Sequence, residues 1–194
     1  MTIQSFVDSY VESLRRAAAR LDRERIEQAV HWLRDTRDAG GQIFVAGNGG
    51  SAAISANLVV DLVKCGSVRK QRRFRAINLT DSVSSLTALA NDEGYETIFS
   101  EPLRNFADPG DLLVVISGSG DSPNVLAAVD TAHELGCRTV ALTSGAQGRL
   151  RSMAQLPLLV ESTHMGILED GFFLLSHALT YPFIEDVVDG PQDD

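Results

Sequence analysis

The sequence lacks the features that mark several specialised classes of protein. It has two cysteines in 194 residues, Cys65 and Cys137, far apart and without metal-binding spacing, which excludes a disulfide framework and a cysteine-rich zinc site. No apolar run approaches the length of a membrane span, and the first residues lack the basic start and apolar core of a secretory signal. We therefore expect a soluble, cytoplasmic protein with no membrane partner.

Positive charge is also scarce. The chain has 17 Lys and Arg against 26 Asp and Glu. Its net charge of -9 argues against nucleic acid as a partner, because the phosphate backbone binds basic surfaces. The exception is VRKQRRFR at 68–75, which contains five basic residues. We interpret it as a solvated loop whose cations offset nearby carboxylates, and the alternative is a patch that attracts anionic substrates.

Nucleotide-binding fingerprints are missing as well. There is no G-x-x-x-x-G-K-[ST] motif, and no G-x-G-x-x-G opens a helix after a strand, so we expect no organic cofactor. What is present is a composition of 44% hydrophobic and 22% charged residues, enough for one core. We predict a single domain at 1–188, followed by an acidic tail at 189–194 that is too polar to pack.

Hydrophobic periodicity predicts two leading helices and then an alternation of strands and helices. The leading helices cover residues 3–20 and the stretch from about Arg23. Five short apolar runs, at 42–47, 74–79, 112–117, 138–143 and 156–160, are separated by helical patterns at 51–65, 82–104, 123–135 and 148–153, and a last helix begins near Gly166. This order predicts an α/β fold, a three-layer sandwich around a five-stranded parallel sheet.

Two of the predicted strands run into loops of similar chemistry. The first loop reads GNGGS at 47–51 and the second reads SGSGDSP at 117–123, and each precedes a helix. Glycines allow a tight turn, Ser51 is suited to cap its helix, and free N–H groups at a helix start attract anions. Taken singly, the first loop is as consistent with plain turn geometry as with ligand binding, and the second could be a loop that only caps its helix. Together they favour a phosphorylated ligand.

Four motifs carry a resemblance to a known family. GNGGSA at 47–52, LTALANDEGYETIFS at 86–100, GDLLVVISGSGDSPNVLAA at 110–128 and ILEDGFFLLSHAL at 167–179 resemble the sugar isomerase (SIS) domain family, and within it the sedoheptulose 7-phosphate isomerases, or phosphoheptose isomerases. The resemblance implies the SIS fold and interconversion of a ketose phosphate and an aldose phosphate. It also implies a homotetramer with its sites at subunit interfaces.

The resemblance implies a set of residues that bind the phosphorylated sugar. In the family the serine-rich loop holds the phosphate, and the first loop and the N-D-x-G-[YF] segment lie near the sugar. The corresponding residues are Asn48, Gly49, Ser51, Asn91, Asp92, Ser117, Ser119 and Ser122. For Asp92, capping a helix is the equal alternative. Asp121 stands where many relatives have asparagine, and its carboxylate would repel a phosphate unless it turns toward backbone donors.

The catalytic residues are implied in the same way. Isomerisation needs a base that moves a proton between C1 and C2 through an enediol, and an acid that serves the two oxygens. The family's glutamate and histidine correspond to Asp61 and His177, and Glu169 aligns with a family glutamine. Besides Asp121 and Glu169, the chain departs from the family with Asn57 for a histidine, Asp61 for the glutamate and Cys65 for an arginine. Asp61, Glu169 and His177 are thus the predicted catalytic set, with Glu169 as an alternative base.

The same departures leave two further questions open. Some relatives bind zinc at the positions of Asn57, Asp61, Glu169 and His177, so the resemblance implies a Zn²⁺ site in which Asp61, Glu169 and His177 are the ligands. Other members of the fold bind phosphosugars without turnover, and one relative binds a replication initiator. A non-catalytic binding protein is therefore the alternative function. His177 opposite a carboxylate is needed only for catalysis.

Overall fold

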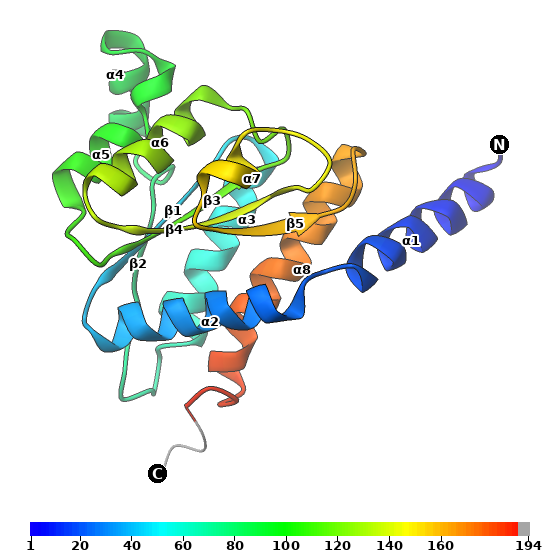
Figure 1. Cartoon of the computed structure of the whole chain (residues 1–194), viewed down its shortest axis with the longest axis horizontal. Helices are drawn as coiled ribbons and strands as arrows, with labels where there is room; N and C mark the ends of the chain where they lie inside the picture. Colours follow the sequence, from blue (N-terminus) through cyan, green and yellow to red (C-terminus); the bar gives the residue numbers. More distant parts are fainter. Residues whose placement is uncertain (190–194) are drawn as a thin grey trace.

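Five short apolar strands form one parallel sheet at the centre of the molecule, as the sequence predicts (Figure 1). The computed structural model describes residues 1–189. Asp189 pairs with Arg37 at 2.6 Å, so the prediction that the tail at 189–194 does not pack is wrong at its first residue, and residues 190–194 lie outside the described residues. The strands lie in the order β2-β1-β3-β4-β5. Their bounds are Gln42–Gly47 for β1, Arg75–Asn78 for β2, Leu112–Ser117 for β3, Arg138–Ser144 for β4 and Leu156–Val160 for β5.

Helices cover both faces of this sheet. Along β1, Ile43 and Val45 belong to one hydrophobic cluster, and Phe44 and Ala46 belong to the other. Because side chains alternate across a strand, both faces are buried, and this explains why the strands read as continuous apolar runs. α2 (Arg23–Asp38), α3 (Gly50–Val60) and α8 (Met165–Ile184) cover the first face, while α5 (Ser100–Phe106), α6 (Pro123–Glu134) and the short α7 (Leu150–Met153) cover the second.

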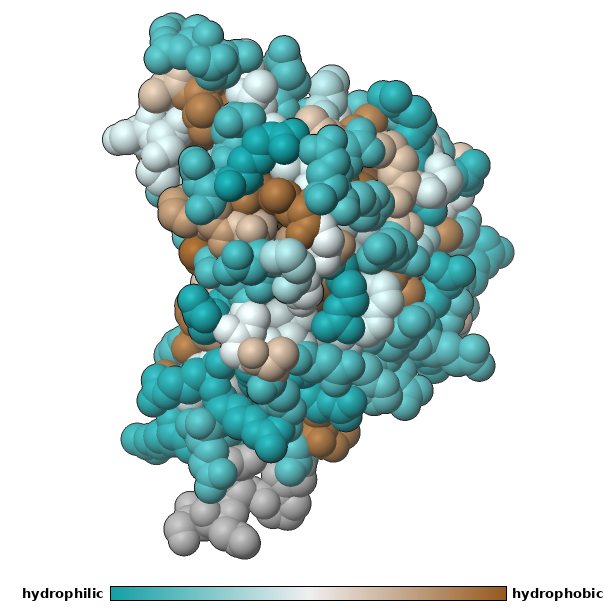
Figure 2. All heavy atoms as spheres, turned by 60° about the vertical axis from the view of Figure 1, so that its left-hand side comes forward, coloured by the Kyte–Doolittle hydropathy of each residue, from teal (hydrophilic) through white to brown (hydrophobic). Residues whose placement is uncertain are grey.

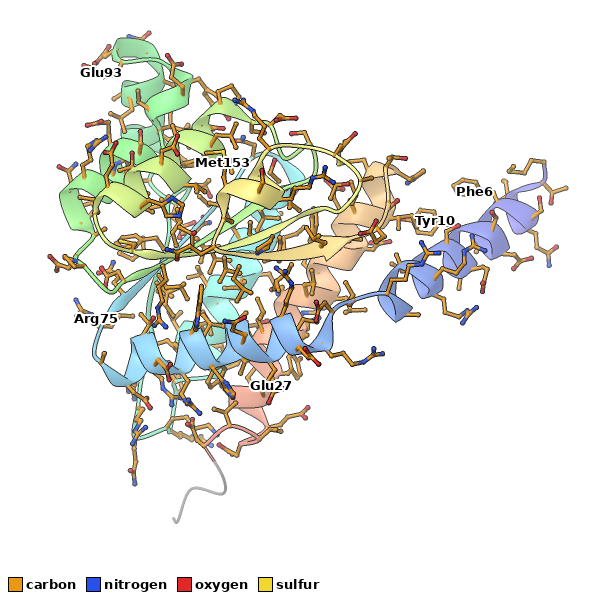
Figure 3. The ribbon with its side chains drawn as sticks, viewed as in Figure 1. Phe6, Tyr10, Glu27, Arg75, Glu93 and Met153 are labelled. Carbon is orange, nitrogen blue, oxygen red and sulfur yellow. The ribbon has the colours of Figure 1, made fainter. Side chains whose placement is uncertain are left out.

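The first helix stands apart from these layers. α1 (Ile3–Ala19) contacts α8, and the Tyr10 hydroxyl donates to the Asp170 carboxylate at 2.7 Å. Beyond this contact the helix projects from the body of the molecule, and Phe6 stands on the projecting part (Figure 3). Its apolar side chains there are largely exposed, namely Ile3, Phe6, Val7 and Val11.

Two helical segments differ from the sequence prediction. The helix predicted at 51–65 ends as an α-helix at Val60 and continues as one π-helical turn, η1 (Asp61–Cys65), in which the Gly66 N–H donates to the Asp61 carbonyl. The region 82–104 divides into α4 (Val83–Asp92), the 3-10 turn η2 (Tyr95–Thr97) and α5. Gly94, with a φ of +104°, interrupts the helical path between the first two.

None of the helices among residues 1–189 is both long enough and apolar enough to cross a membrane.

Candidate functional site

The two glycine- and serine-rich loops lie side by side at the carboxyl edge of the sheet. The first follows β1 and the second follows β3, and these neighbouring strands mark the point where the strand order reverses. Open α/β sheets bind their ligands at this kind of switch point. The loops and the start of α8 enclose a cavity of about 270 Å³. It is lined by Asn48, Ser51, Ile116, Ser117, Gly118, Ser119, Ser122, Met165 and Glu169.

Glycine is needed at two positions of the first loop for two different structural reasons. Gly49 has a φ of +55° and precedes the first residue of α3, and no side chain caps this helix. A Cβ on Gly50 would lie 2.2 Å from a carboxylate oxygen of Glu169, so glycine lets Glu169 approach the helix start. The prediction that Ser51 caps the helix is wrong, because α3 already begins at Gly50 and Ser51 lies inside it, buried at the cavity wall.

The second loop brings three serine hydroxyls together. The Oγ atoms of Ser117, Ser119 and Ser122 lie 3.4 Å from one another. The Ser117 Oγ accepts the Gly120 N–H at 3.2 Å, and the Ser119 Oγ accepts the Asp121 N–H at 3.3 Å. These two contacts use oxygen lone pairs, so the hydroxyl protons lie in the long contacts among the three Oγ atoms, from which a ligand can draw them. The result is a cluster of donors at the start of α6, suited to an anion.

Asp121 does not place its charge in this cluster. Its carboxylate accepts both the backbone N–H and the side-chain Nε of Arg149, each at 3.1 Å. The backbone hydrogen bond, followed by the side-chain bond, lowers the pKa of Asp121 below its ordinary value. The condition derived from the sequence, that this carboxylate must turn toward backbone donors, is therefore met.

Asn48 joins the two loops and a third segment. Its carboxamide exchanges two hydrogen bonds of 2.9 Å with the carboxamide of Asn124 in α6, and its Oδ1 also accepts the Tyr95 hydroxyl at 3.0 Å. Sequence reasoning missed Asn124 and Tyr95. Tyr95 is the last residue of the NDEGY segment, so a motif pointed to it as a site residue. Asn124 follows a proline within a helix, and no sequence motif distinguishes it.

Asn91 and Asp92 lie elsewhere in this protomer. They end α4, where the Asn91 amide donates to the Asp92 carboxylate at 2.7 Å, so the alternative that Asp92 starts a helix as its cap is wrong. Asp92 lines a separate, mainly apolar groove between α4 and the body. Figure 2 shows apolar side chains gathered on this side of the molecule, below α4. Neither residue is brought to the cavity at the serine cluster.

Asp61 and His177 form a second group of polar side chains. The His177 Nε2 lies 3.9 Å from the Asp61 Oδ2, and the Asn57 Nδ2 lies 3.2 Å from the same oxygen and 3.4 Å from the His177 Nε2. The Thr180 hydroxyl lies 3.5 Å from this oxygen. The Asp61 side chain is 14% exposed and that of His177 is 50% exposed, so the carboxylate is sheltered and the imidazole faces outward.

Glu169 does not join this pair. α3 and α8 pack against each other in the same direction, so Gly50 meets Glu169 at one end, and Asn57 and Asp61 meet His177 further along. From residue 169 to residue 177 the helix rises by about 12 Å. The three predicted catalytic residues are therefore divided between the cavity, which holds Glu169, and the Asp61–His177 pair.

The predicted metal ligands were tested against the same geometry. Among residues 1–189, no three His, Cys, Asp or Glu side chains gather as ligands for a metal ion. Glu169 is too far along α8, and Asn57 turns its amide N–H groups, which cannot ligate, toward Asp61 and His177. The residues present in one protomer do not fit a zinc site, and zinc stays a prediction from the resemblance.

The basic stretch at 68–75 lies away from both groups. Lys70 pairs with Asp186 and Arg72 pairs with Asp38. These contacts agree with the interpretation that its cations offset nearby carboxylates.

Comparison with known proteins gives the family. The family model for the SIS domain matches residues 5–144. The chain belongs to the SIS domain family. It is 35% identical over 174 residues to a probable phosphoheptose isomerase of Thermoplasma volcanium, covering 89% of this chain and 88% of that protein. It is 42% identical over 155 residues to a phosphoheptose isomerase of a Geobacter species, covering 79% and 80%.

A solved structure agrees with these sequence relatives. The phosphoheptose isomerase of Francisella tularensis superposes on this SIS domain with a TM-score of 0.87 and 31% identity, covering 95% of this chain and all of that one. The family resemblance and the five-stranded SIS fold predicted from the sequence are both confirmed.

Proposed function

We propose that this SIS domain is an aldose–ketose isomerase that converts sedoheptulose 7-phosphate into an aldose heptose 7-phosphate. The proposal is supported by relatives named phosphoheptose isomerase that match most of the chain. It is supported independently by a donor cluster suited to a phosphate and by a separate carboxylate–imidazole pair suited to proton transfer.

The phosphate binds at the serine cluster. Three hydroxyls that contact only one another with their protons, together with the start of α6, offer hydrogen bonds and a positive dipole end to a dianion. Because Asp121 is held by Arg149, no carboxylate of this loop opposes the phosphate. Glu169 lines the same cavity, and its carboxylate is suited to accept hydrogen bonds from sugar hydroxyls rather than to meet the phosphate.

The observation that carries the substrate assignment is the distance between the cavity and the Asp61–His177 pair. From Ser51 to Asp61 the helix rises by about 15 Å. At bond lengths near 1.5 Å, an extended heptose phosphate spans about 10 Å from C1 to phosphorus. With a hydrogen bond of about 3 Å at each end, such a molecule reaches from the serine cluster to the pair, whereas a triose phosphate does not. This length sets a lower limit that a hexose phosphate also nearly meets, and the choice of a heptose is supported by the relatives named phosphoheptose isomerase.

The pair then performs the isomerisation. Asp61 takes the proton from C1 of the ketose, which gives an enediol, and returns it to C2, while His177 moves a proton between O1 and O2. The Asn57 amide directs a donor at the Asp61 Oδ2 and holds the carboxylate in place. The Thr180 hydroxyl lies beside the same oxygen but donates its one proton to the Ser176 carbonyl at 3.1 Å. This assignment uses only residues of the chain, and the catalytic role of Glu169 predicted from the sequence becomes a binding role.

We further propose a homotetramer whose subunits cover the path between the cavity and the pair. Around the pair, apolar side chains are exposed on α3, η1 and α8, namely Val60, Val63, Phe173, Leu174 and Tyr181. The projecting part of α1 adds a second apolar surface. Exposed apolar surface of this extent is typical of subunit interfaces. Both cysteines are free thiols, which suits the cytoplasm as the proposed location.

A chain-length series tests the substrate assignment. Purified protein is assayed with ketose phosphates of three, five, six and seven carbons, and binding is measured beside turnover. We expect all four to bind through the phosphate and turnover to be highest with sedoheptulose 7-phosphate. Equal or higher turnover of the triose phosphate would contradict the distance argument. Mass photometry tests the assembly; we expect tetramers, and smaller species for the variant Val63→Asp.

A further inference from the structure

The orientation of the Asn48 carboxamide is fixed by a chain of hydrogen bonds that begins at the backbone. The Val125 N–H is shared between the Ser122 carbonyl and the Asn124 Oδ1, each at 3.0 Å. A backbone N–H can only donate, so this contact identifies the oxygen of the Asn124 amide, and its nitrogen must face the other way. Asn124 is 1% exposed, so it has no water to turn toward.

Asn124 in turn orients Asn48. Because the Asn124 Oδ1 accepts, the group of Asn48 that faces it must be the Nδ2, and the Asn48 Oδ1 must face the Asn124 Nδ2; both contacts are 2.9 Å. The Tyr95 hydroxyl then donates to the Asn48 Oδ1 at 3.0 Å. Both lone pairs of that oxygen are therefore used. A flipped Asn48 would place its N–H groups against the Asn124 Nδ2, which can only donate, so Asn124 fixes the orientation and Tyr95 supplies the second hydrogen bond to the oxygen.

One hydrogen of Asn48 remains available. The Nδ2 carries two hydrogens, of which one goes to Asn124, and among residues 1–189 the other has no protein acceptor. Asn48 lines the cavity beside the serine cluster. We propose that Asn124 and Tyr95 are positioning residues that make Asn48 a donor, and only a donor, toward an oxygen of the sugar next to the phosphate. This inference rests on the proposed function for the identity of the ligand.

The arrangement has a consequence for specificity. A site that presents only an N–H at this position binds an oxygen acceptor and gains nothing from a group that can only donate, such as an ammonium group of an amino sugar. The hydroxyl of Tyr95 is the removable part of the chain of hydrogen bonds, because Tyr95 is 53% exposed and its ring fills no core position.

A double-mutant cycle tests the inference. Calorimetric titrations with sedoheptulose 7-phosphate and with inorganic phosphate are made on the wild type, Tyr95→Phe, Asn48→Ala and the double variant. We expect Tyr95→Phe to weaken sugar phosphate binding roughly threefold to tenfold, the worth of one neutral hydrogen bond, and to leave phosphate binding unchanged. In the Asn48→Ala background we expect Tyr95→Phe to have no further effect.

Control variants separate positioning from structure. Tyr10→Phe removes a tyrosine hydroxyl hydrogen bond outside the cavity and should leave both affinities unchanged. The variant Asn124→Ala, checked for folding by circular dichroism, loses the donor to the Asn48 Oδ1 without adding a charge and should weaken sugar phosphate binding at least as much as Tyr95→Phe does.

The outcomes are distinct for the two proposals. The same loss from Tyr95→Phe in both backgrounds, or no loss in either, would overturn the positioning role. If the wild-type protein binds the sugar phosphate without turning it over, the proposed isomerase function is contradicted. The positioning role is still tested in that case, because the double-mutant cycle measures binding.

Discussion

Replacing His177 with alanine should separate catalysis from binding. General acid–base catalysis by one positioned side chain contributes a factor of about 10²–10⁴ to the rate. We therefore expect turnover to fall by about 10²–10⁴. Since each tenfold corresponds to about 1.4 kcal/mol, this is a loss of about 3–5.5 kcal/mol of transition-state stabilisation. The side chain is half exposed and packs against Phe173 and Tyr181 only by ring contacts, so its removal leaves no cavity in the core.

Binding should change far less than turnover. His177 lies about 12 Å along α8 from Glu169 at the serine cavity, too far to contact the phosphate. We expect inorganic phosphate affinity to be unchanged and sugar phosphate affinity to fall by less than about tenfold, the worth of one hydrogen bond. Initial rates and calorimetric titrations measure the two effects, with His31→Ala, an exposed histidine on α2, as the matched control.

Two results would refute this reasoning. If turnover and sugar phosphate affinity fell by the same factor in His177→Ala, the imidazole would act in uniform binding and not in the chemical step. If turnover were unchanged, the acid must be another group.

Three further predictions follow from the same geometry. Ser119→Ala removes one of the three hydroxyls and should weaken inorganic phosphate binding roughly tenfold, the worth of a hydrogen bond to a charged group, by calorimetric titration; an unchanged affinity would place the phosphate elsewhere. Turnover should survive EDTA, because one protomer lacks a fitting set of ligands among residues 1–189; loss on EDTA and recovery with zinc would restore the metal prediction. Asp189→Asn should lower the free energy of unfolding by about 1.5–3 kcal/mol in urea titrations at pH 7, because Arg37 is 1% exposed and binds both Asp189 oxygens. The Arg37 guanidinium lowers the pKa of Asp189, so this stabilisation is fully present above the ordinary aspartate pKa of about 3.9 and is lost progressively as the pH falls from there through the lowered pKa of the folded state. A difference between wild type and variant that does not shrink as the pH is lowered below about 3.9 would contradict this.

The sequence was most informative where local physics decides the structure. Apolar runs bounded by glycine predicted the five strands, because strands buried on both faces need no alternation. The position of the serine loop was also predictable, because Pro123 marks the first turn of a helix and the three serines directly precede it. The mutual 3.4 Å spacing of the three oxygens could not be predicted, because it depends on backbone contacts inside the loop.

The separation of Glu169 from Asp61 and His177 needed the structure. Spacing along α8 places Glu169 and His177 on one face, but it does not tell which part of α3 each of them meets. At Gly50 a missing side chain leaves room for the Glu169 carboxylate at the start of α3, a contact that spacing along α8 does not reveal. The roles of Tyr95 and Asn124 were hidden for a similar reason, since both act through Asn48 across gaps of more than forty residues in the chain.

The central claim is that the chain isomerises a heptose phosphate by moving a proton between C1 and C2. The most direct test is a proton NMR time course of the purified protein with sedoheptulose 7-phosphate in deuterated water. The account predicts an aldose phosphate that carries deuterium at C2, since the carbon-bound proton passes through a base that exchanges with solvent. Ligand binding with neither conversion nor exchange would contradict it and would identify the protein as a phosphosugar-binding member of the family.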